Sequence, residues 1–229
     1  MKKKLLRKIT GAALALFLLA GAVPCCAHAS TIAEDAANLL IKYPEEPGEI
    51  ADEVYSRLME FYDNPLIVCA FMGNMYRESD MTPWRWEGDD SDDGSYSAKL
   101  NETIMPDLGC PDDMTRYYFT HFSYMTGLYG FGLCQWTDIG RKLLMYDMAV
   151  ETGRRLDDVS LQCDFLIWEM QNHYPELDEE LREIEELDVL CNRIASTYER
   201  CHPGQMSITV RYAYAAYYYE QYTGEVYEP

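Results

Sequence analysis

The stretch NPLIVCAFMGNMYRESD, at residues 64–80, predicts a buried helix and, with it, a helical fold. Asn64 supplies a side chain that caps helices, and Pro65 suits a first helical turn because its missing N–H needs no partner there. The apolar residues that follow recur at helical spacing, and Pro83 excludes a much longer helix. We therefore expect a helix that begins at Pro65 and ends near Asp80.

Helical periodicity continues on both sides of this segment. Apolar residues recur at helical spacing in five further stretches, at about 52–62, 138–153, 163–174, 190–198 and 207–222. Gly153 and Gly224 are suited to end two of these helices. No stretch shows the sustained alternation that is typical of a strand, so the expected fold class is mainly α.

The segment at about 82–129 is the exception, because it is rich in Asp, Gly and Pro and has only scattered apolar residues. A connection this long is uncommon inside a compact domain. We expect an irregular insertion that forms either a flap beside a site or a small β-hairpin. Its acidic run at 89–94 fits part of a calcium loop, but Leu100 stands where the bidentate ligand belongs. A solvated acidic loop is favoured, and no metal or cofactor is predicted.

The first 29 residues are typical of a secretory signal peptide. Five Lys and Arg residues precede a 13-residue apolar run at 11–23, and Ala27-His28-Ala29 offers a cleavage site. That run is too short for a membrane-spanning helix, which needs roughly 20 residues. We expect residues 1–29 to be a signal peptide, residues 30–229 to form a single domain, and the protein to be secreted.

The charge of the chain excludes a non-specific nucleic-acid binder. Of its 229 residues, 39 are Asp or Glu and 19 are Lys or Arg, which gives a net charge of −20. Binding to phosphates needs clustered cations, and the only cluster lies in the first eight residues. Nucleic acid is therefore not an expected partner.

Six of the eight cysteines lie beyond the predicted signal peptide, and an even number in a secreted protein suggests disulfides. The sequence does not choose among the pairings, although a disulfide between Cys110 and Cys134 could fasten the insertion to the rest of the domain. No CxxC unit is present, which disfavours a zinc site. A cysteine peptidase with Cys134 and His121 as nucleophile and base is a further hypothesis, but disulfides explain the cysteines better.

The motif GNMYRES, at residues 73–79, places Glu78 at the C-terminal end of the apolar helix. A carboxyl that is partly desolvated at the negative end of a helix dipole tends to keep its proton. Such a group can serve as a general acid near neutral pH.

The motif YGFGLCQWT, at residues 129–137, is a glycine-spaced aromatic turn that leads into a helix. Glycines allow the backbone to approach a ligand closely. Gln135 offers a donor and an acceptor, and Trp136 offers a flat face for a sugar ring.

Glu-Ser at the end of one helix, followed by Gly-Leu-x-Gln at the start of another, resembles the paired signature of the goose-type lysozyme and lytic transglycosylase superfamily. More of the chain looks like the phage tail-tip lysozyme family. The further matches are Met72-Gly73-Asn74, Gly140-Arg141, Gln162 with Phe165-Leu166, and Tyr198-Glu199. The resemblance covers roughly residues 64–222.

This resemblance implies a lysozyme-like helical domain, and with the predicted signal peptide we expect it to be secreted and associated with the cell wall. It implies cleavage of the β-1,4 bond between N-acetylmuramic acid and N-acetylglucosamine in peptidoglycan glycan strands, with Glu78 as the catalytic acid. Tyr212 and Tyr218 fit the aromatic third motif of the superfamily as well as Tyr214 does. The residues taken as substrate-binding are Ser79, Gln135, Trp136 and Tyr214.

Several alternatives stay open at this point. The second carboxylate of a glycosidase is not assigned, and Glu87 and Asp93 are candidates for it. A lytic transglycosylase would act on the same bond and form an anhydro product. A non-catalytic wall-binding or assembly module would retain the fold without turnover. Because an acidic protein is repelled by polyanionic walls, a secretion, conjugation or tail-like assembly is a candidate partner that localises it.

Overall fold

The helix expected at 64–80 is present and lies among three other helices. In the computed structural model it is α4 (Pro65–Ser79), and the Asn64 side chain accepts a hydrogen bond from the Leu66 N–H at 2.9 Å. It ends at Asp80, which adopts a left-handed conformation with φ of 51°. The predicted start and end of this helix are both confirmed.

The structure describes residues 43–88, 95–104, 113–121, 123–124, 127–201 and 206–228. All of them belong to one compact unit, Tyr43–Pro229. The predicted signal peptide and the acidic run at 89–94, which includes Asp93, lie outside the described residues.

The fold class is confirmed, because the described residues are mainly helical. One antiparallel hairpin pairs β1 (Ser123–Tyr124) with β2 (Gly127–Leu128). Besides α4, the helices are α3 (Glu49–Tyr62), α5 (Ser95–Ile104), α6 (Asp113–His121), α7 (Ile139–Thr152), α8 (Val159–Asn172), α9 (Pro175–Glu183), α10 (Leu187–Arg193), the π-helical η3 (Ile194–Tyr198) and α11 (Ile208–Thr223). No helix in these ranges is both long and apolar enough to cross a membrane.

The segment at 82–129 is more regular than its composition predicts. The small hairpin is confirmed, but the helices α5 and α6 were missed. Two polar side chains of α5 are buried: Ser97 accepts from the Trp86 N–H at 2.9 Å, and Asn101 accepts from the Trp86 indole at 2.7 Å. Buried polar side chains such as these weaken the apolar periodicity by which a helix is recognised in a sequence.

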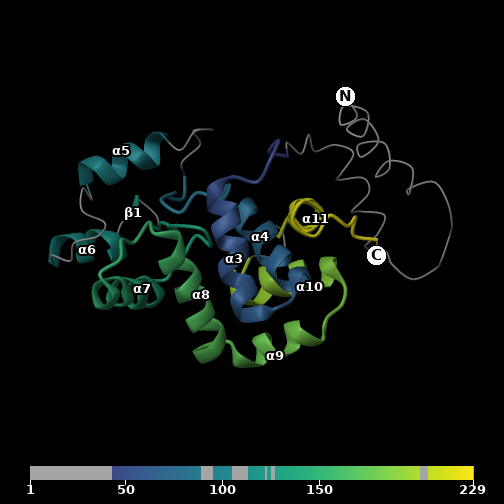
Figure 1. Ribbon diagram of the computed structural model, residues 1–229. Helices are drawn as coiled ribbons and strands as arrows, with labels where there is room; N and C mark the ends of the chain where they lie inside the picture. The colour runs from purple at the N-terminus through teal and green to yellow at the C-terminus, as the bar shows by residue number, and fades with distance from the viewer. Residues whose placement is uncertain are drawn as a thin grey trace. The chain divides into compact units, whose positions relative to one another are not determined.

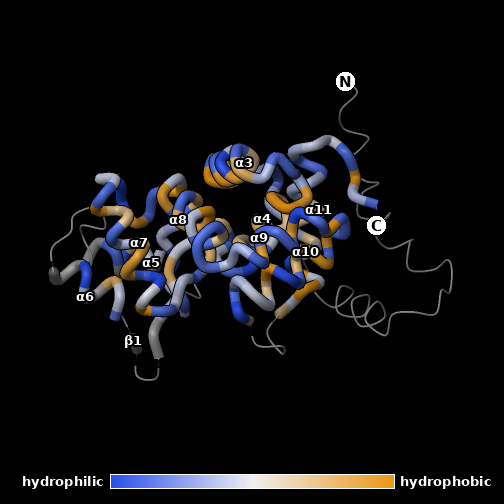
Figure 2. The backbone as a smooth tube through the Cα atoms, turned by 90° about the horizontal axis from the view of Figure 1, so that it is seen from below, coloured by the Kyte–Doolittle hydropathy of each residue, from blue (hydrophilic) through white to orange (hydrophobic). Residues whose placement is uncertain are grey.

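The centre of the core is the contact between α4 and α11, with α3 and α10 packed against α4 (Figure 1). Hydrophobic and hydrophilic stretches alternate along the helices in Figure 2, as expected of helices that bury one face. Gly73 allows the close approach of α4 and α11. A Cβ at this position would lie 2.3 Å from the carbonyl oxygen of Arg211 and 2.7 Å from the backbone nitrogen of Ala215.

We expect Gly73→Ala to destabilise the protein by about 1–3 kcal/mol, because backbone atoms of α11 would have to move. Alanine normally stabilises a helix relative to glycine by up to about 1 kcal/mol, so the sign of the change tests the contact. Urea unfolding measures it. Gly48→Ala controls for the loss of a glycine without a steric clash, since a Cβ at this N-cap of α3 meets nothing within 4 Å. A gain in stability for Gly73→Ala would contradict the packing described.

The predicted disulfides are absent among the described cysteines. Cys69, Cys134, Cys163 and Cys191 are buried free thiols, and Cys201 is a partly exposed one. The disulfide considered between Cys110 and Cys134 is therefore not supported, and Cys110 itself lies outside the described residues. The four buried cysteines act as small apolar side chains of the core.

Candidate active site

Glu78 lies in the last turn of α4 and forms an ion pair with Arg211, from the first turn of α11. The Nη2 group of Arg211 donates to Oε1 of Glu78. The side chain of Glu78 is 21% exposed, whereas that of Arg211 is only 2% exposed. A buried guanidinium needs a counter-charge, and the sequence did not reveal that Glu78 supplies it.

Arg211 is held in place by groups around it. Its Nε donates to the Met206 carbonyl at 2.6 Å, and its Nη1 donates to Oδ1 of Asn74 at 2.9 Å. Asn74 precedes Glu78 by one helical turn and is itself fixed by a bond from its Nδ2 to the Ala70 carbonyl at 2.8 Å. One signal for Arg211 exists in the sequence, because it is the only charged residue between Ile208 and Tyr219.

Cys201 is the third group at this position. Its Sγ lies 3.8 Å from Oε1 of Glu78 and 3.2 Å from Nη2 of Arg211. Burial raises the pKa of the Cys201 thiol to about 11, an effect that Arg211 opposes. The group is therefore a thiol at neutral pH.

Glu199 is a fourth group near Glu78 that the sequence analysis named only within a family match. Its Oε1 is buried and has no hydrogen-bond partner among the described residues. The pKa of Glu199 is raised to about 8, first by burial and second by the negative charge of Glu78, while Arg211 and Arg141 act in the opposite direction. This carboxyl therefore holds a proton at neutral pH.

Ser79 joins the end of α4 to the glycine-spaced turn. It is 1% exposed, and its hydroxyl lies 3.0 Å from the carbonyl oxygens of both Met75 and Leu133. The two motifs predicted to carry chemistry are thus brought together. Ser79 achieves this from within the core, so the predicted contact with substrate does not fit its position.

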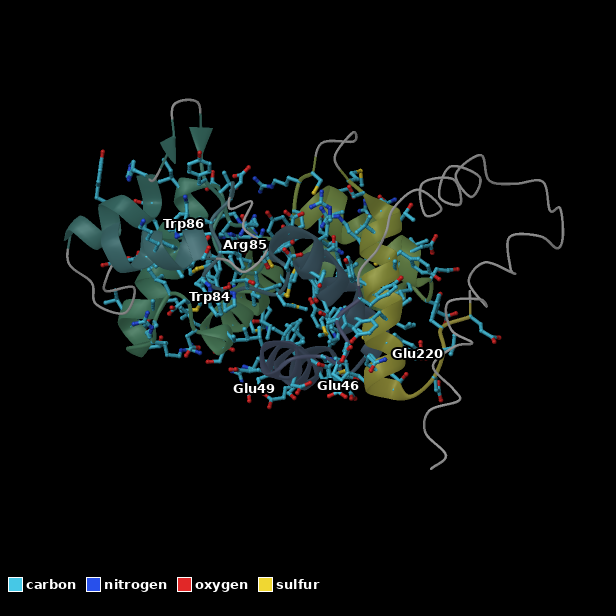
Figure 3. The ribbon with its side chains drawn as sticks, turned by 90° about the horizontal axis from the view of Figure 1, so that it is seen from above. Glu46, Glu49, Trp84, Arg85, Trp86 and Glu220 are labelled. Carbon is cyan, nitrogen blue, oxygen red and sulfur yellow. The ribbon has the colours of Figure 1, made fainter. Side chains whose placement is uncertain are left out.

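Gln135 remains partly exposed at the surface of the turn. Its Nε2 donates to the carbonyls of Gly132 at 2.9 Å and Arg85 at 3.1 Å, and its backbone is left-handed with φ of 47°. Figure 3 labels Arg85 close to Trp84 and Trp86, on the segment that follows α4. The bonds of Gln135 therefore fix the turn against this segment.

Gln162 of α8 is fully buried and forms hydrogen bonds to both the turn and the segment that follows α4. Its Oε1 accepts from the Leu133 N–H at 2.9 Å, and its Nε2 donates to the Pro83 carbonyl at 2.6 Å. A Cβ on Gly132, whose φ is 78°, would lie 2.7 Å from that Oε1. Glycine is required here because the backbone is left-handed and because the Gln162 side chain leaves no room for a Cβ.

Trp136 is fully buried, so it offers no face to a sugar ring, and this part of the prediction is wrong. Its indole donates to Oε2 of Glu169 at 2.9 Å. Glu169 also accepts two bonds from Arg141, at 2.7 and 2.8 Å, and one from the Tyr198 hydroxyl at 2.7 Å. The tryptophan belongs to a buried polar network beneath the site, because its N–H needs a partner in the core.

A family model described as phage tail lysozyme matches residues 49–222. The chain belongs to the phage tail lysozyme family. The match runs from the start of α3 into α11 and includes Glu78, Glu199 and Arg211. No curated protein and no solved structure matches the chain. Membership of the phage tail lysozyme family supports a lysozyme-like, peptidoglycan-degrading function.

Tyr214 packs on a different face of α4 from the one that bears Glu78. Its ring centroid lies 3.9 Å from that of Tyr76 and 5.7 Å from that of Tyr43, and the residue is 9% exposed. Tyr76 precedes Glu78 by two positions, and residues two apart on a helix do not share a face. The ring contacts of Tyr214 are therefore with Tyr76 and Tyr43.

Glu87, a candidate for the second carboxylate, makes a structural contact. Its Oε2 accepts from the Gly130 N–H at 3.0 Å, and its own N–H donates to the Gly130 carbonyl at 2.9 Å. These bonds fasten the segment after α4 to the glycine-spaced turn. The other candidate, Asp93, lies outside the described residues.

A peptidase nucleophile is not found at Cys134. This cysteine is 2% exposed, and burial raises the pKa of its thiol well above the ordinary range, which opposes formation of a thiolate. Within the described ranges, no group of three or more His, Cys, Asp or Glu residues is arranged to hold a metal ion.

Proposed function

We propose that the protein is a secreted, wall-associated muramidase that cleaves the β-1,4 bond between N-acetylmuramic acid and N-acetylglucosamine. Glu78 is the general acid that protonates the glycosidic oxygen, and the partly exposed Gln135 contacts the glycan strand beside it. The observation that carries the proposal is the position of Glu78. Its side chain is 21% exposed beside the buried guanidinium of Arg211, within a chain of the phage tail lysozyme family.

Three contacts support this role for Glu78. Arg211 fixes the carboxylate from one side, and Asn74 holds Arg211 in turn. The neighbouring Ser79 ties the end of α4 to the turn that carries Gln135. A general acid has to be held within hydrogen-bond reach of the leaving oxygen, and these contacts restrict the carboxyl of Glu78 to one place.

Mass spectrometry of purified peptidoglycan, digested with the protein and with its Glu78→Gln variant, tests the proposal. We expect soluble muropeptides with reducing ends from the wild-type protein only. Anhydro-muropeptides would instead identify a lytic transglycosylase. Wall binding without any soluble product, from either protein, would contradict the proposal and indicate a non-catalytic binding or assembly module.

Charge predicts how the rate depends on salt. The chain carries a net charge of −20 and bacterial walls are polyanionic, so repulsion slows association at low ionic strength. We expect muropeptide release to become faster as NaCl is raised from about 10 mM to about 150 mM, because the Debye length falls from about 30 to about 8 Å. A rate that only falls with added salt would contradict this expectation. Localisation by a secretion, conjugation or tail-like assembly would overcome the same repulsion.

A further inference from the structure

Trp84 differs from the other three tryptophans of the chain in what surrounds its ring. Trp86 and Trp136 are fully buried, and each donates a hydrogen bond from its indole N–H. Trp168 is partly exposed and packs on two neighbouring rings, at centroid distances of 6.0 and 4.9 Å. Trp84 is also partly exposed, but within the described ranges its ring has no aromatic neighbour and its indole N–H has no hydrogen-bond partner. Its ring is therefore not accounted for by packing of the core.

The backbone does not explain a tryptophan at this position either. The Arg85 N–H donates to the Thr82 carbonyl at 3.2 Å, so Pro83 and Trp84 are the two central residues of a tight turn. Proline suits the first central position because its φ is already fixed near the required value. Such turns are built mostly from Gly, Pro, Asn, Asp and Ser, which serve the backbone, whereas a large aromatic side chain brings no such advantage.

The turn that carries Trp84 is held in place by side chains from three other parts of the chain. The consecutive carbonyls of residues 83–85 accept hydrogen bonds from Gln162 of α8 at 2.6 Å, Asn101 of α5 at 3.1 Å and Gln135 of the glycine-spaced turn at 3.1 Å, in that order. These bonds fix the backbone and leave the indole of Trp84 unused. A side chain on a backbone that is already fixed loses less entropy when it binds a ligand.

Trp84 lies close to the proposed acid in space as well as in sequence. The Thr82 N–H donates to the Ser79 carbonyl at 3.0 Å, so one tight turn directly follows Glu78 and leads into the turn that carries Trp84. A tight turn keeps its first and last Cα atoms within about 7 Å, so the two turns together place Arg85 within about 14 Å of Ser79. One glycan strand can therefore reach both Glu78 and Trp84.

The chemistry of an indole suits a sugar ring. Its flat apolar face can cover the C–H face of a pyranose, and its N–H can donate to a hydroxyl or an acetamido oxygen. Neither contact depends on charge. This matters in a protein of net charge −20, which cannot rely on attraction to a polyanionic wall.

We propose that an N-acetylhexosamine ring of the glycan strand stacks on Trp84, in a subsite beside the one that Glu78 and Gln135 serve. This inference rests on the proposed function, and it gives Trp84 the role that the sequence analysis expected of Trp136. Trp84 takes no part in proton transfer. Because it contacts the strand equally before and during cleavage of the bond, it should act on affinity and not on the chemical step.

Binding of soluble glycan strands, freed of their peptides, measures this contact in the full chain. The Glu78→Gln background keeps the strands intact. Trp84→Leu, which keeps an apolar side chain but removes the flat ring, should raise the Kd about 10-fold, and Trp84→Tyr should restore most of the affinity. Trp168→Leu is the matched control and should leave the Kd unchanged, since that ring is already packed. An unchanged Kd for Trp84→Leu, or no measurable binding before Trp84 is changed, would overturn the proposal.

Tryptophan fluorescence gives a readout that a merely structural role would not produce. A sugar that covers the ring of Trp84 removes it from water, so saturation with glycan should shift the emission of Glu78→Gln to shorter wavelength. The shift should disappear when Trp84→Phe is added, a change that keeps an aromatic ring at the turn. A shift that persists in this double variant would place the contact at another tryptophan and overturn the proposal.

Kinetics separate this proposal from the proposed function. With Glu78 intact, Trp84→Leu should raise the KM for muropeptide release about 10-fold and change kcat by less than about 2-fold, as expected when binding is lost equally from substrate and transition state. A lower kcat at unchanged KM would overturn the stacking role. If wild type releases no muropeptides but Trp84→Leu weakens glycan binding, the subsite stands and the enzymatic function fails. If wild type releases muropeptides and binding ignores Trp84, the function stands and the subsite fails.

Discussion

Replacement of Glu78 by glutamine should lower the rate of muropeptide release at least about 10²-fold. The amide has nearly the same shape as the carboxyl but has no proton to give to the glycosidic oxygen. The affinity of the protein for peptidoglycan should change much less, because the carboxyl is 21% exposed and only one group among those that would contact the glycan. Initial rates of release of soluble muropeptides, measured beside a pull-down with insoluble wall, check both parts.

The variant also leaves the buried charge of Arg211 without its partner, so its folding has to be confirmed by circular dichroism and urea unfolding. Glu183→Gln provides the matched control for activity, because it removes an exposed carboxylate of α9 that has no contact with Glu78. Release of muropeptides by Glu78→Gln at the wild-type rate would remove this residue from the mechanism.

Replacement of Glu169 by alanine should lower the free energy of unfolding by about 3–5 kcal/mol, the largest loss of stability that we expect. Glu169 is 0% exposed. It accepts hydrogen bonds from Trp136, from Tyr198 and from the Nε and Nη2 groups of Arg141. Its removal leaves the guanidinium, itself only 12% exposed, without a counter-charge in the core. Guanidinium chloride unfolding measures the loss.

The exposed pair between Glu180 and Arg193 is a suitable comparison. Its two hydrogen bonds have lengths of 2.7 and 2.6 Å, close to those between Arg141 and Glu169, but the two side chains are 43% and 38% exposed. Glu180→Ala should lower the free energy of unfolding by at most about 1 kcal/mol, because solvent screens a surface pair. Similar losses for the two variants would show that burial does not control the strength of these pairs.

The helices that the sequence predicts well are those with an apolar stripe and a clear cap. Asn64 caps α4 and Asp138 caps α7, and Gly153 and Gly224 end α7 and α11 as expected. Helix α9 was missed because it buries only Leu177 and Leu181 and is otherwise highly charged. The continuous stretch expected at 190–198 is divided into α10 and a π-helix, a change in hydrogen bonding that leaves no mark in hydropathy.

The candidate site could be predicted only in part, because its two motifs are local and its charge pairs are not. Glu78 and the turn with Gln135 were found as short patterns. The partner of Glu78 lies 133 positions away, and no local pattern in a single sequence connects the two. Trp136 was misassigned for a similar reason. A tryptophan whose indole donates to a buried carboxylate and a tryptophan that faces a sugar have the same local sequence.

The free cysteines have a consequence for how the protein can be made and handled. In the described ranges, packing and hydrogen bonds alone hold the core together, and no disulfide links distant parts of the chain. A domain of this size buries enough surface for that, whereas very small secreted domains depend on such links. Reducing agents should therefore leave these parts of the fold intact, and recombinant production does not need an oxidising host compartment to assemble them.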